Sequence, residues 1–170
     1  VYYERIENAQ PVEGWAQLDG DTFMAPGSFE AALRAVGGNV DAVDRVMAGE
    51  AQNAFVACRP PGHHAEKATP MGFCLFSTVA IAAIHAANVH GLDRVAVLDF
   101  DVHHGNGTQD VLWHESRARF VSSHQMPLFP GTGGLHQKGA FGQIINMPLQ
   151  SGTDGAEMQD VWDRVLTDEI

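Results

Sequence analysis

Two pairs of adjacent histidines are the residues in this sequence best suited to chemistry. They are His63-His64 and His103-His104, in a chain of 170 residues with nine histidines. Imidazole can bind a metal or move a proton near neutral pH. Pro60-Pro61-Gly62 precedes the first pair and restricts the directions in which its rings can point. The simpler alternative for the first pair is a Pro-Gly turn that carries two surface histidines.

The first pair can divide acid and base roles if each ring has its own orienting partner. The candidate partners are Asp99 for one ring and Asn106 for the other. A carboxylate raises the basicity of an imidazole, whereas an amide orients the ring without adding charge. Such partners would move the two histidine pKa values apart, as paired acid/base roles require.

The run Asp99-Phe-Asp101-Val-His103 supplies candidate metal ligands. At the two-residue period of an extended segment, its three polar side chains point the same way. A carboxylate oxygen and an imidazole nitrogen on one side suit a borderline cation such as zinc. Alternatively, the aspartates cap the next helix and His103 is a satisfied polar group.

These polar clusters follow predicted strands, and the alternation of strands with helices predicts an α/β fold with a mainly parallel sheet. Ligands of such sheets bind beyond the carboxyl ends of the strands. Strands are predicted over 53–57, 94–99, 119–123 and 144–148, and the first three lead into 59–64, 99–106 and His124. Helices are predicted over 2–9, from an N-cap at Ser28 to a stop at Gly49, and over 76–87, 106–113 and 156–166.

Composition limits the classes of protein and partner. With 45% hydrophobic and 18% charged residues, the chain is predicted to form one globular domain. A net charge of −11 argues against direct nucleic-acid binding and is compatible with a cationic ligand. The longest apolar stretch, 73–87, is interrupted by Ser77, Thr78 and His85, so no membrane span is predicted. Cys58 and Cys74 are interpreted as reduced thiols of an intracellular protein.

Four motifs occur in order and together resemble the histone deacetylase superfamily, which includes acetylpolyamine amidohydrolases and acetoin-utilization proteins. They are Arg-Pro-Pro-Gly-His-His over 59–64, Gly-Phe-Cys over 72–74, Asp-Phe-Asp-Val-His-His-Gly-Asn-Gly-Thr-Gln over 99–109 and Phe-Pro-Gly-Thr-Gly over 129–133. Asn106 makes the chain most similar to the class II-like branch. The resemblance implies a three-layer α/β/α fold, like arginase and deacetylase cores.

The resemblance also implies roles for individual residues. Asp101 and His103 would be zinc ligands, and His63 and His64 would be the catalytic pair, with Asp99 and Asn106 as partners. A narrow substrate channel would be lined by Gly72, Phe73 and Phe129. A monovalent cation, expected to be potassium, would be surrounded by Asp99, Asp101, His103 and Ser122. From the residues alone, Phe73 and Phe129 would be predicted as core aromatics.

Two expected family residues have no counterpart, namely a second aspartate as third zinc ligand and a tyrosine that donates to the oxyanion. Tyr2 and Tyr3 are the only tyrosines, and the late aspartates lie in turn or helix contexts. We therefore expect 1–170 to be a single partial deacetylase-like domain that binds zinc weakly or not at all and is inactive alone.

The resemblance implies zinc-dependent removal of acyl groups from acetyl-lysine or acetylpolyamine-type amines. A cytoplasmic homo-oligomer is expected, since a partial domain would leave a strand edge and apolar faces exposed. Two alternatives stay open. One is a non-enzymatic remnant or interaction fragment, and the other is an arginase-like enzyme with two manganese ions, which would need further Asp and His ligands.

Overall fold

The structure is a computed structural model that describes residues 1–168. Its elements in chain order are α1 (Tyr2–Asn8), β1 (Ala16–Gln17), β2 (Phe23–Met24), α2 (Ser28–Met47), α3 (Thr78–Val89), β3 (Val95–Asp99), α4 (Asn106–Leu112), β4 (Ala118–Gln125), β5 (Ile144–Leu149) and α5 (Gly155–Asp168). The strands β3, β4 and β5 form a parallel sheet in that order, and β1 pairs with β2 as a small antiparallel ribbon.

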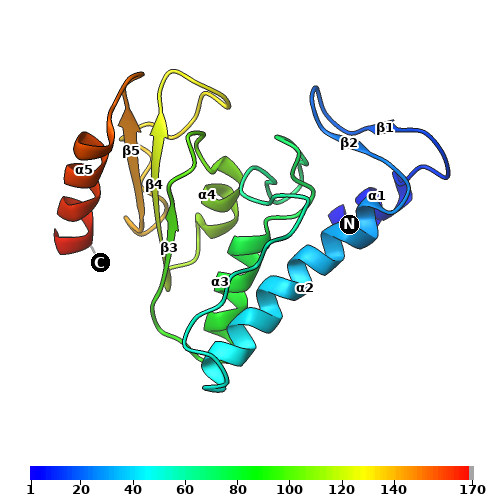
Figure 1. The fold of residues 1–170 in the computed structure, drawn as a ribbon, viewed down its shortest axis with the longest axis horizontal. Helices are drawn as coiled ribbons and strands as arrows, with labels where there is room; N and C mark the ends of the chain where they lie inside the picture. Colours follow the sequence, from blue (N-terminus) through cyan, green and yellow to red (C-terminus); the bar gives the residue numbers. More distant parts are fainter. Residues whose placement is uncertain (169–170) are drawn as a thin grey trace.

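Helices cover both faces of the parallel sheet, which confirms the predicted α/β class and the layered arrangement. Figure 1 shows α5 on one side of the sheet and α3 and α4 on the other, with α2 packed outside α3. The indole N–H of Trp162 on α5 donates to Ser123 Oγ on β4 at 3.0 Å, which ties the outer helix to the central strand. No helix within residues 1–168 is both long and apolar enough to cross a membrane.

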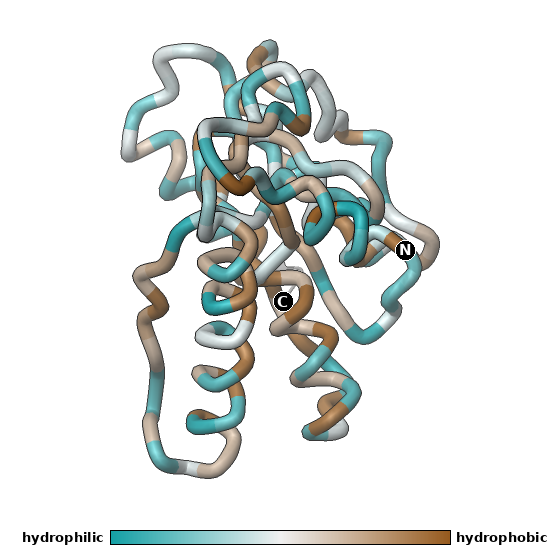
Figure 2. Tube along the Cα trace, turned by 90° about the vertical axis from the view of Figure 1, so that its right-hand side faces the viewer, coloured by the Kyte–Doolittle hydropathy of each residue, from teal (hydrophilic) through white to brown (hydrophobic). Residues whose placement is uncertain are grey.

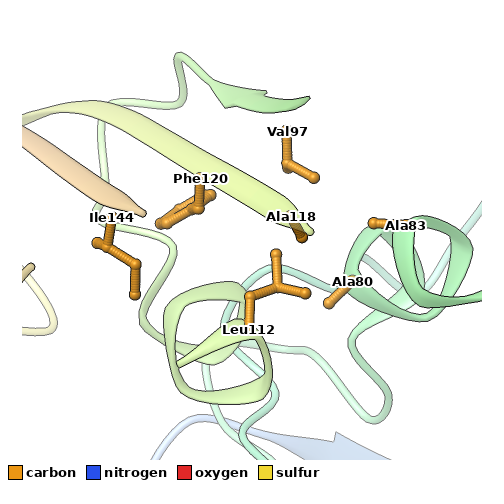
Figure 3. Packing of buried hydrophobic residues seen from close by; sticks show 7 residues of the cluster. All are labelled: Ala80, Ala83, Val97, Leu112, Ala118, Phe120 and Ile144. Carbon is orange, nitrogen blue, oxygen red and sulfur yellow. The ribbon is translucent and has the colours of Figure 1, made fainter. Parts of the chain in front are cut away.

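The main core lies between the sheet and the α3–α4 layer. Residues at alternate positions of a strand face the same side, so Ala118 and Phe120 of β4 both point toward the helices. Figure 3 shows the seven buried side chains that meet there: Ala80, Ala83, Val97, Leu112, Ala118, Phe120 and Ile144. The alanines of α3 let this helix approach the sheet closely.

A second cluster joins the N-terminal segment to α2. Its buried members are Ile6, Met24, Phe29, Ala32 and Leu75. Figure 2 shows apolar and polar residues alternating along helical segments; α2 and α5 each have an apolar side to bury, whereas the Ala-rich α3 is apolar around most of its surface. The predicted N-cap of α2 shifts by one residue, because Gly27 is the cap and the Ser28 hydroxyl instead accepts the N–H of Ala25 at 2.9 Å.

The predicted strand over 53–57 is wrong. Residues 53–57 have no strand structure, and the three-stranded sheet contains only β3, β4 and β5. A strand needs a neighbour for its backbone hydrogen bonds, and this segment pairs with no strand; only Val56 of it is partly buried, against Gly38 of α2. The Phe55 side chain is 92% exposed. The histidine pair that follows is therefore positioned by a loop and not by a strand end.

Candidate active site

The carboxyl end of β3 places Asp99 at the centre of the polar cluster. Asp99 lies beside Ser122 in the register of the parallel pair β3–β4. The carboxylate is largely buried and uses both oxygens: Oδ2 accepts from His63 Nδ1 at 3.0 Å, and Oδ1 accepts the N–H of Asp101 at 3.1 Å. Gly105 packs directly against this carboxylate, so a side chain at that position would collide with it.

The segment after Asp99 is bent and not extended. The carboxylate of Asp101 accepts the N–H of His103 at 2.8 Å, which repeats the turn that Asp99 makes with Asp101. Asp101 and His103 nevertheless face one another, with 3.3 Å between Asp101 Oδ1 and His103 Nδ1. Asp101 and His103 are therefore brought together by turns in which carboxylates accept backbone N–H groups. They do not depend on the two-residue period of an extended segment.

The helix α4 holds the first histidine pair in place. The carbonyl of His63 accepts the N–H groups of Gly107 at 2.9 Å and Thr108 at 3.1 Å. These are first-turn donors that have no partner within the helix, so the loop caps the helix and the helix fixes the loop. Gly107 makes this contact possible, because a Cβ there would lie only 2.5 Å from the carbonyl carbons of His64 and Ala65.

His64 and Asn106 form the second histidine–partner pair. His64 Nδ1 and Asn106 Oδ1 are 2.9 Å apart, and the Asn106 amide nitrogen donates to Glu66 Oε1 at 2.8 Å. Because the amide nitrogen faces Glu66, the oxygen must face His64, which assigns the ring proton to Nδ1. The Nε2 atom of His64 then carries a lone pair that can accept a proton.

The pKa values of the two histidines shift in opposite directions, as predicted. Burial of His63 works against its charged form, but the hydrogen bond and charge of Asp99, with the charge of Asp101, outweigh burial and raise the pKa. For His64, burial and the neighbouring His63 lower the pKa. The rings lie 3.9 Å apart between centroids. At neutral pH this favours a neutral His64 beside a more basic His63.

Gly72 and Phe129 enclose the His64 ring, whereas Phe73 stands apart from it. The Phe129 ring lies edge-on to His64 at 5.0 Å and to His103 at 5.9 Å. A Cβ on Gly72 would come within 2.6 Å of His64 Cγ, so only glycine fits there. Phe73 is 63% exposed and lines a separate cavity of about 460 Å³ with Trp15.

Sequence reasoning missed a buried network that supports the loop carrying Phe129. His104 Nδ1 pairs with Thr132 Oγ1 at 2.8 Å, and His124 Nε2 donates to the carbonyl of Gly133 at 3.0 Å. Burial, with the nearby His124, lowers the pKa of His104 to about 4, so this ring is neutral. Glu66, the partner of Asn106, was also missed. The Phe-Pro-Gly-Thr-Gly motif over 129–133 was the available sequence signal for the buried network, whereas no signal in the sequence pointed to Glu66.

Asp101 and His103 suit a zinc ion. On a tetrahedral zinc with bonds of about 2.0–2.1 Å, two ligand atoms lie about 3.3 Å apart, which is the separation observed between them. No third His, Cys, Asp or Glu donor joins this pair within residues 1–168. Asp154, one of the late aspartates, caps α5 through its contacts with the N–H groups of Ala156 and Glu157.

Neither tyrosine faces the site. The Tyr2 hydroxyl donates to the carbonyl of Leu75 at 2.7 Å, and the Tyr3 ring packs on Phe29. Ser122, which was predicted to line a cation site, is fully buried on β4, where its hydroxyl pairs with His124 Nδ1 at 3.0 Å. The site as described thus has two histidine–partner pairs, two candidate metal-ligand side chains and one aromatic wall.

Comparison with known proteins identifies the family. Residues 2–170 match the family model described as Histone deacetylase domain. The chain is 41% identical over 155 residues to Histone deacetylase-like amidohydrolase of Pseudomonas aeruginosa, covering 89% of this chain and 40% of that protein. It is 41% identical over 155 residues to Histone deacetylase 10, chloroplastic, of Oryza sativa subsp. japonica, covering 86% and 35%.

A solved structure agrees. The acetylpolyamine aminohydrolase from Burkholderia pseudomallei superimposes with a TM-score of 0.81 at 34% identity, covering 88% of this chain and 44% of that one. The chain thus spans less than half the length of each of these three proteins. Because the family model matches residues 2–170 and two relatives are 41% identical over 155 residues, the chain belongs to the histone deacetylase domain family.

Proposed function

We propose that this chain supplies the acid/base half of a zinc-dependent amidohydrolase site that removes acyl groups from amines. The observation that carries the proposal is the paired arrangement of His63–Asp99 and His64–Asn106 beside the facing side chains of Asp101 and His103. An arginase-like site with two manganese ions is less well supported, because it needs more carboxylate and imidazole ligands at this edge of the sheet than the described residues bring together.

Each histidine has a distinct task in this proposal. His64, neutral and with Nε2 available, accepts the proton of the attacking water and returns it to the leaving amine. His63, held toward its cationic form by Asp99, stabilises negative charge that develops on the acyl carbon's substituents. Zinc, when held by Asp101 and His103 with a third ligand, would polarise the acyl carbonyl and acidify water.

The acylated amine enters beside Phe129. This ring stands against both His64 and His103, so a flat acyl amide can lie along it and reach the proton-accepting atom. Acetyl-lysine and acetylpolyamine are the two substrate classes we propose, and the net charge of −11 favours amines that carry a further positive charge. Phe73, which is more exposed, would contact substrate farther from the reacting bond.

The 170-residue chain by itself is proposed to be inactive. Only two zinc-ligand side chains converge within the described residues, and both tyrosines are engaged away from the site. Two ligands give a weak zinc site, and an oxyanion without a donor loses on the order of 3 kcal/mol of transition-state stabilisation. A potassium ion near Asp99 and Ser122 is part of the same proposal, supported by their adjacent positions in the sheet.

The proposal extends to assembly and location. β3 is an edge strand; Leu98 on it is 41% exposed, and Phe100 and Val102, which follow it, are 72% and 52% exposed. We propose that a second copy of the chain covers this edge, and light scattering at micromolar concentration tests it. A cytoplasmic location is supported by the two cysteines, which are both free.

The function is tested with the full coding product that contains this chain and with the 170-residue chain alone. Both are loaded with zinc and assayed on acetyl-lysine and acetylpolyamine reporters. We expect turnover by the full product, a loss of at least about 100-fold in kcat for His64→Ala, and no loss for His114→Ala, an exposed histidine that serves as the control. A zinc-loaded full product that hydrolyses neither reporter, or an unaffected His64→Ala variant, would overturn the proposal and favour a non-enzymatic role.

A further inference from the structure

Three side chains bring metal-ligand atoms together on the outer helix pair, away from the candidate active site. Asp44 lies on α2, His85 lies within α3, and His90 directly follows α3. The Nε2 atoms of the two histidines lie 2.6 and 2.7 Å from the same oxygen, Asp44 Oδ1. Within residues 1–168, this is the only group of three or more His, Cys, Asp or Glu donors that lie within 4.8 Å of one another.

The fold creates this cluster from separate segments. His85 interrupts the Ala-rich apolar sequence of α3. Five residues later, His90 would lie about 140° around a continuous helix, on a different face. The helix α3 ends at Val89, His90 caps it with φ −96° and ψ 0°, and Gly91 with φ +68° turns the chain beyond it; both histidine side chains nevertheless reach the same Asp44 oxygen. The two rings then lie 5.6 Å apart at 75°.

The chemistry of the donor set points to a divalent transition ion. A carboxylate oxygen accepts only, so both rings present an N–H at Nε2 to it. If each neutral ring moves that proton to Nδ1, the two Nε2 lone pairs and the carboxylate oxygen face one point. Two imidazole nitrogens and one carboxylate oxygen are ligands that zinc binds well, with water completing the coordination.

The side chains have room to adjust around an ion. Donor atoms on a tetrahedral zinc lie about 3.3 Å apart, so each N···O separation must open by about 0.6 Å from its present value. The side chains of Asp44, His85 and His90 are 47%, 20% and 23% exposed, so the carboxylate can move outward and an ion can enter from solvent. The rings are held more firmly than the carboxylate.

We propose that Asp44, His85 and His90 form a second metal site, for zinc or a similar divalent ion, that ties α2 to α3. In Figure 1 the C-terminal ends of α2 and α3 lie at the bottom, opposite the end of the sheet to which the strand arrows point. The site is therefore separate from Asp101 and His103, and its role is to clamp the helix pair. It does not depend on the proposed amidohydrolase function.

The test measures metal binding and stability of the 170-residue chain without any activity readout. Zinc affinity is measured by calorimetry, and cobalt is added as a spectroscopic probe whose visible bands report its ligand set. The variants are His85→Gln and Asp44→Asn at the cluster, the double variant Asp101→Asn/His103→Gln at the candidate active site, and His114→Gln as an exposed histidine control. Circular dichroism checks that each variant is folded.

We expect the tightest zinc site to weaken at least tenfold in His85→Gln and in Asp44→Asn, and to survive in the active-site double variant and the control. Zinc should raise the melting temperature of the wild type and not of the two cluster variants. If His85→Gln does not fold, Asp44→Asn decides, because its side chain is half exposed and its shape is conserved. Zinc binding that is unchanged in a folded cluster variant, or that disappears in the active-site double variant, would overturn the proposal.

Discussion

Replacing Gly107 by alanine tests the contact through which α4 fixes the first histidine pair. A Cβ at this position would lie 2.5 Å from the carbonyl carbons of His64 and Ala65, which are backbone atoms that cannot rotate away. The loop must therefore move. Its movement stretches the hydrogen bonds of 2.9 and 3.1 Å that the His63 carbonyl accepts from the helix.

The expected cost follows from three contributions. Overpacking against backbone costs about 1–3 kcal/mol, and weakening of a buried backbone hydrogen bond costs about 1 kcal/mol. Alanine is better than glycine in a helix by about 1 kcal/mol, which offsets part of this. Gly107→Ala should therefore lower the free energy of unfolding by about 2 kcal/mol, a large share of the typical total.

Gly37→Ala is the matched control, because Gly37 is also helical but has no neighbouring atom within 4 Å of the position that an added methyl group would take. It should stabilise the protein by about 0.5–1 kcal/mol through helix propensity alone. Both variants are measured by urea unfolding followed by circular dichroism. With a slope near 2 kcal/mol per molar urea, the midpoint should fall by about 1 M for Gly107→Ala and rise slightly for Gly37→Ala. A Gly107→Ala midpoint equal to or above that of the wild type would refute the close contact between α4 and the histidine loop.

Three further outcomes are expected. Cys74 is buried, and burial raises the pKa of its thiol to about 11. At pH 8, iodoacetamide should therefore modify the exposed Cys58 and leave Cys74 unmodified until the chain unfolds, which mass spectrometry measures. The Arg117 guanidinium, bonded to both oxygens of Glu115 at 2.7 and 2.8 Å, lowers the pKa of Glu115 to about 2. A lowered folded-state pKa stabilises above the unfolded value of 4.5 and loses that effect between pH 4.5 and 2. Arg117→Met should therefore destabilise more at pH 7 than near pH 2, where only the loss of its hydrogen bonds to Ala87 and Asn88 remains; a pH-independent difference would contradict this. Asn106→Asp in metal-free protein should raise the pKa of His64 in an NMR titration, because a carboxylate would replace the amide beside the ring. It should also destabilise the chain at neutral pH, because it sets a second carboxylate 2.8 Å from that of Glu66. An unchanged His64 titration would argue against the pairing of His64 with residue 106.

The sequence by itself determined the class of the fold and the members of the site. Alternating strand and helix patterns predicted the parallel sheet. The apolar run 94–99 was also predicted to be covered on both faces, but only Val97 of β3 is buried and Leu98 is 41% exposed, because β3 is an edge strand. The two histidine pairs stood out because imidazole can bind a metal or move a proton, and the four ordered motifs then assigned them by resemblance to a known family. Their partners, Asp99 for one ring and Asn106 for the other, were predicted from residue type and are in hydrogen-bond contact with His63 and His64.

Only the tertiary structure decided how these residues are held. The 53–57 segment has the apolar sequence of a strand, but pairing requires a neighbouring strand, and the sequence of one segment does not contain its neighbour. Glu66 explains the amide at Asn106 through a contact 40 residues apart in sequence, and the packing of α2 against α3 brings Asp44 to His85 and His90. Contacts of this kind depend on the path of the whole chain, because a side chain meets whatever the packed elements place within hydrogen-bonding distance of it.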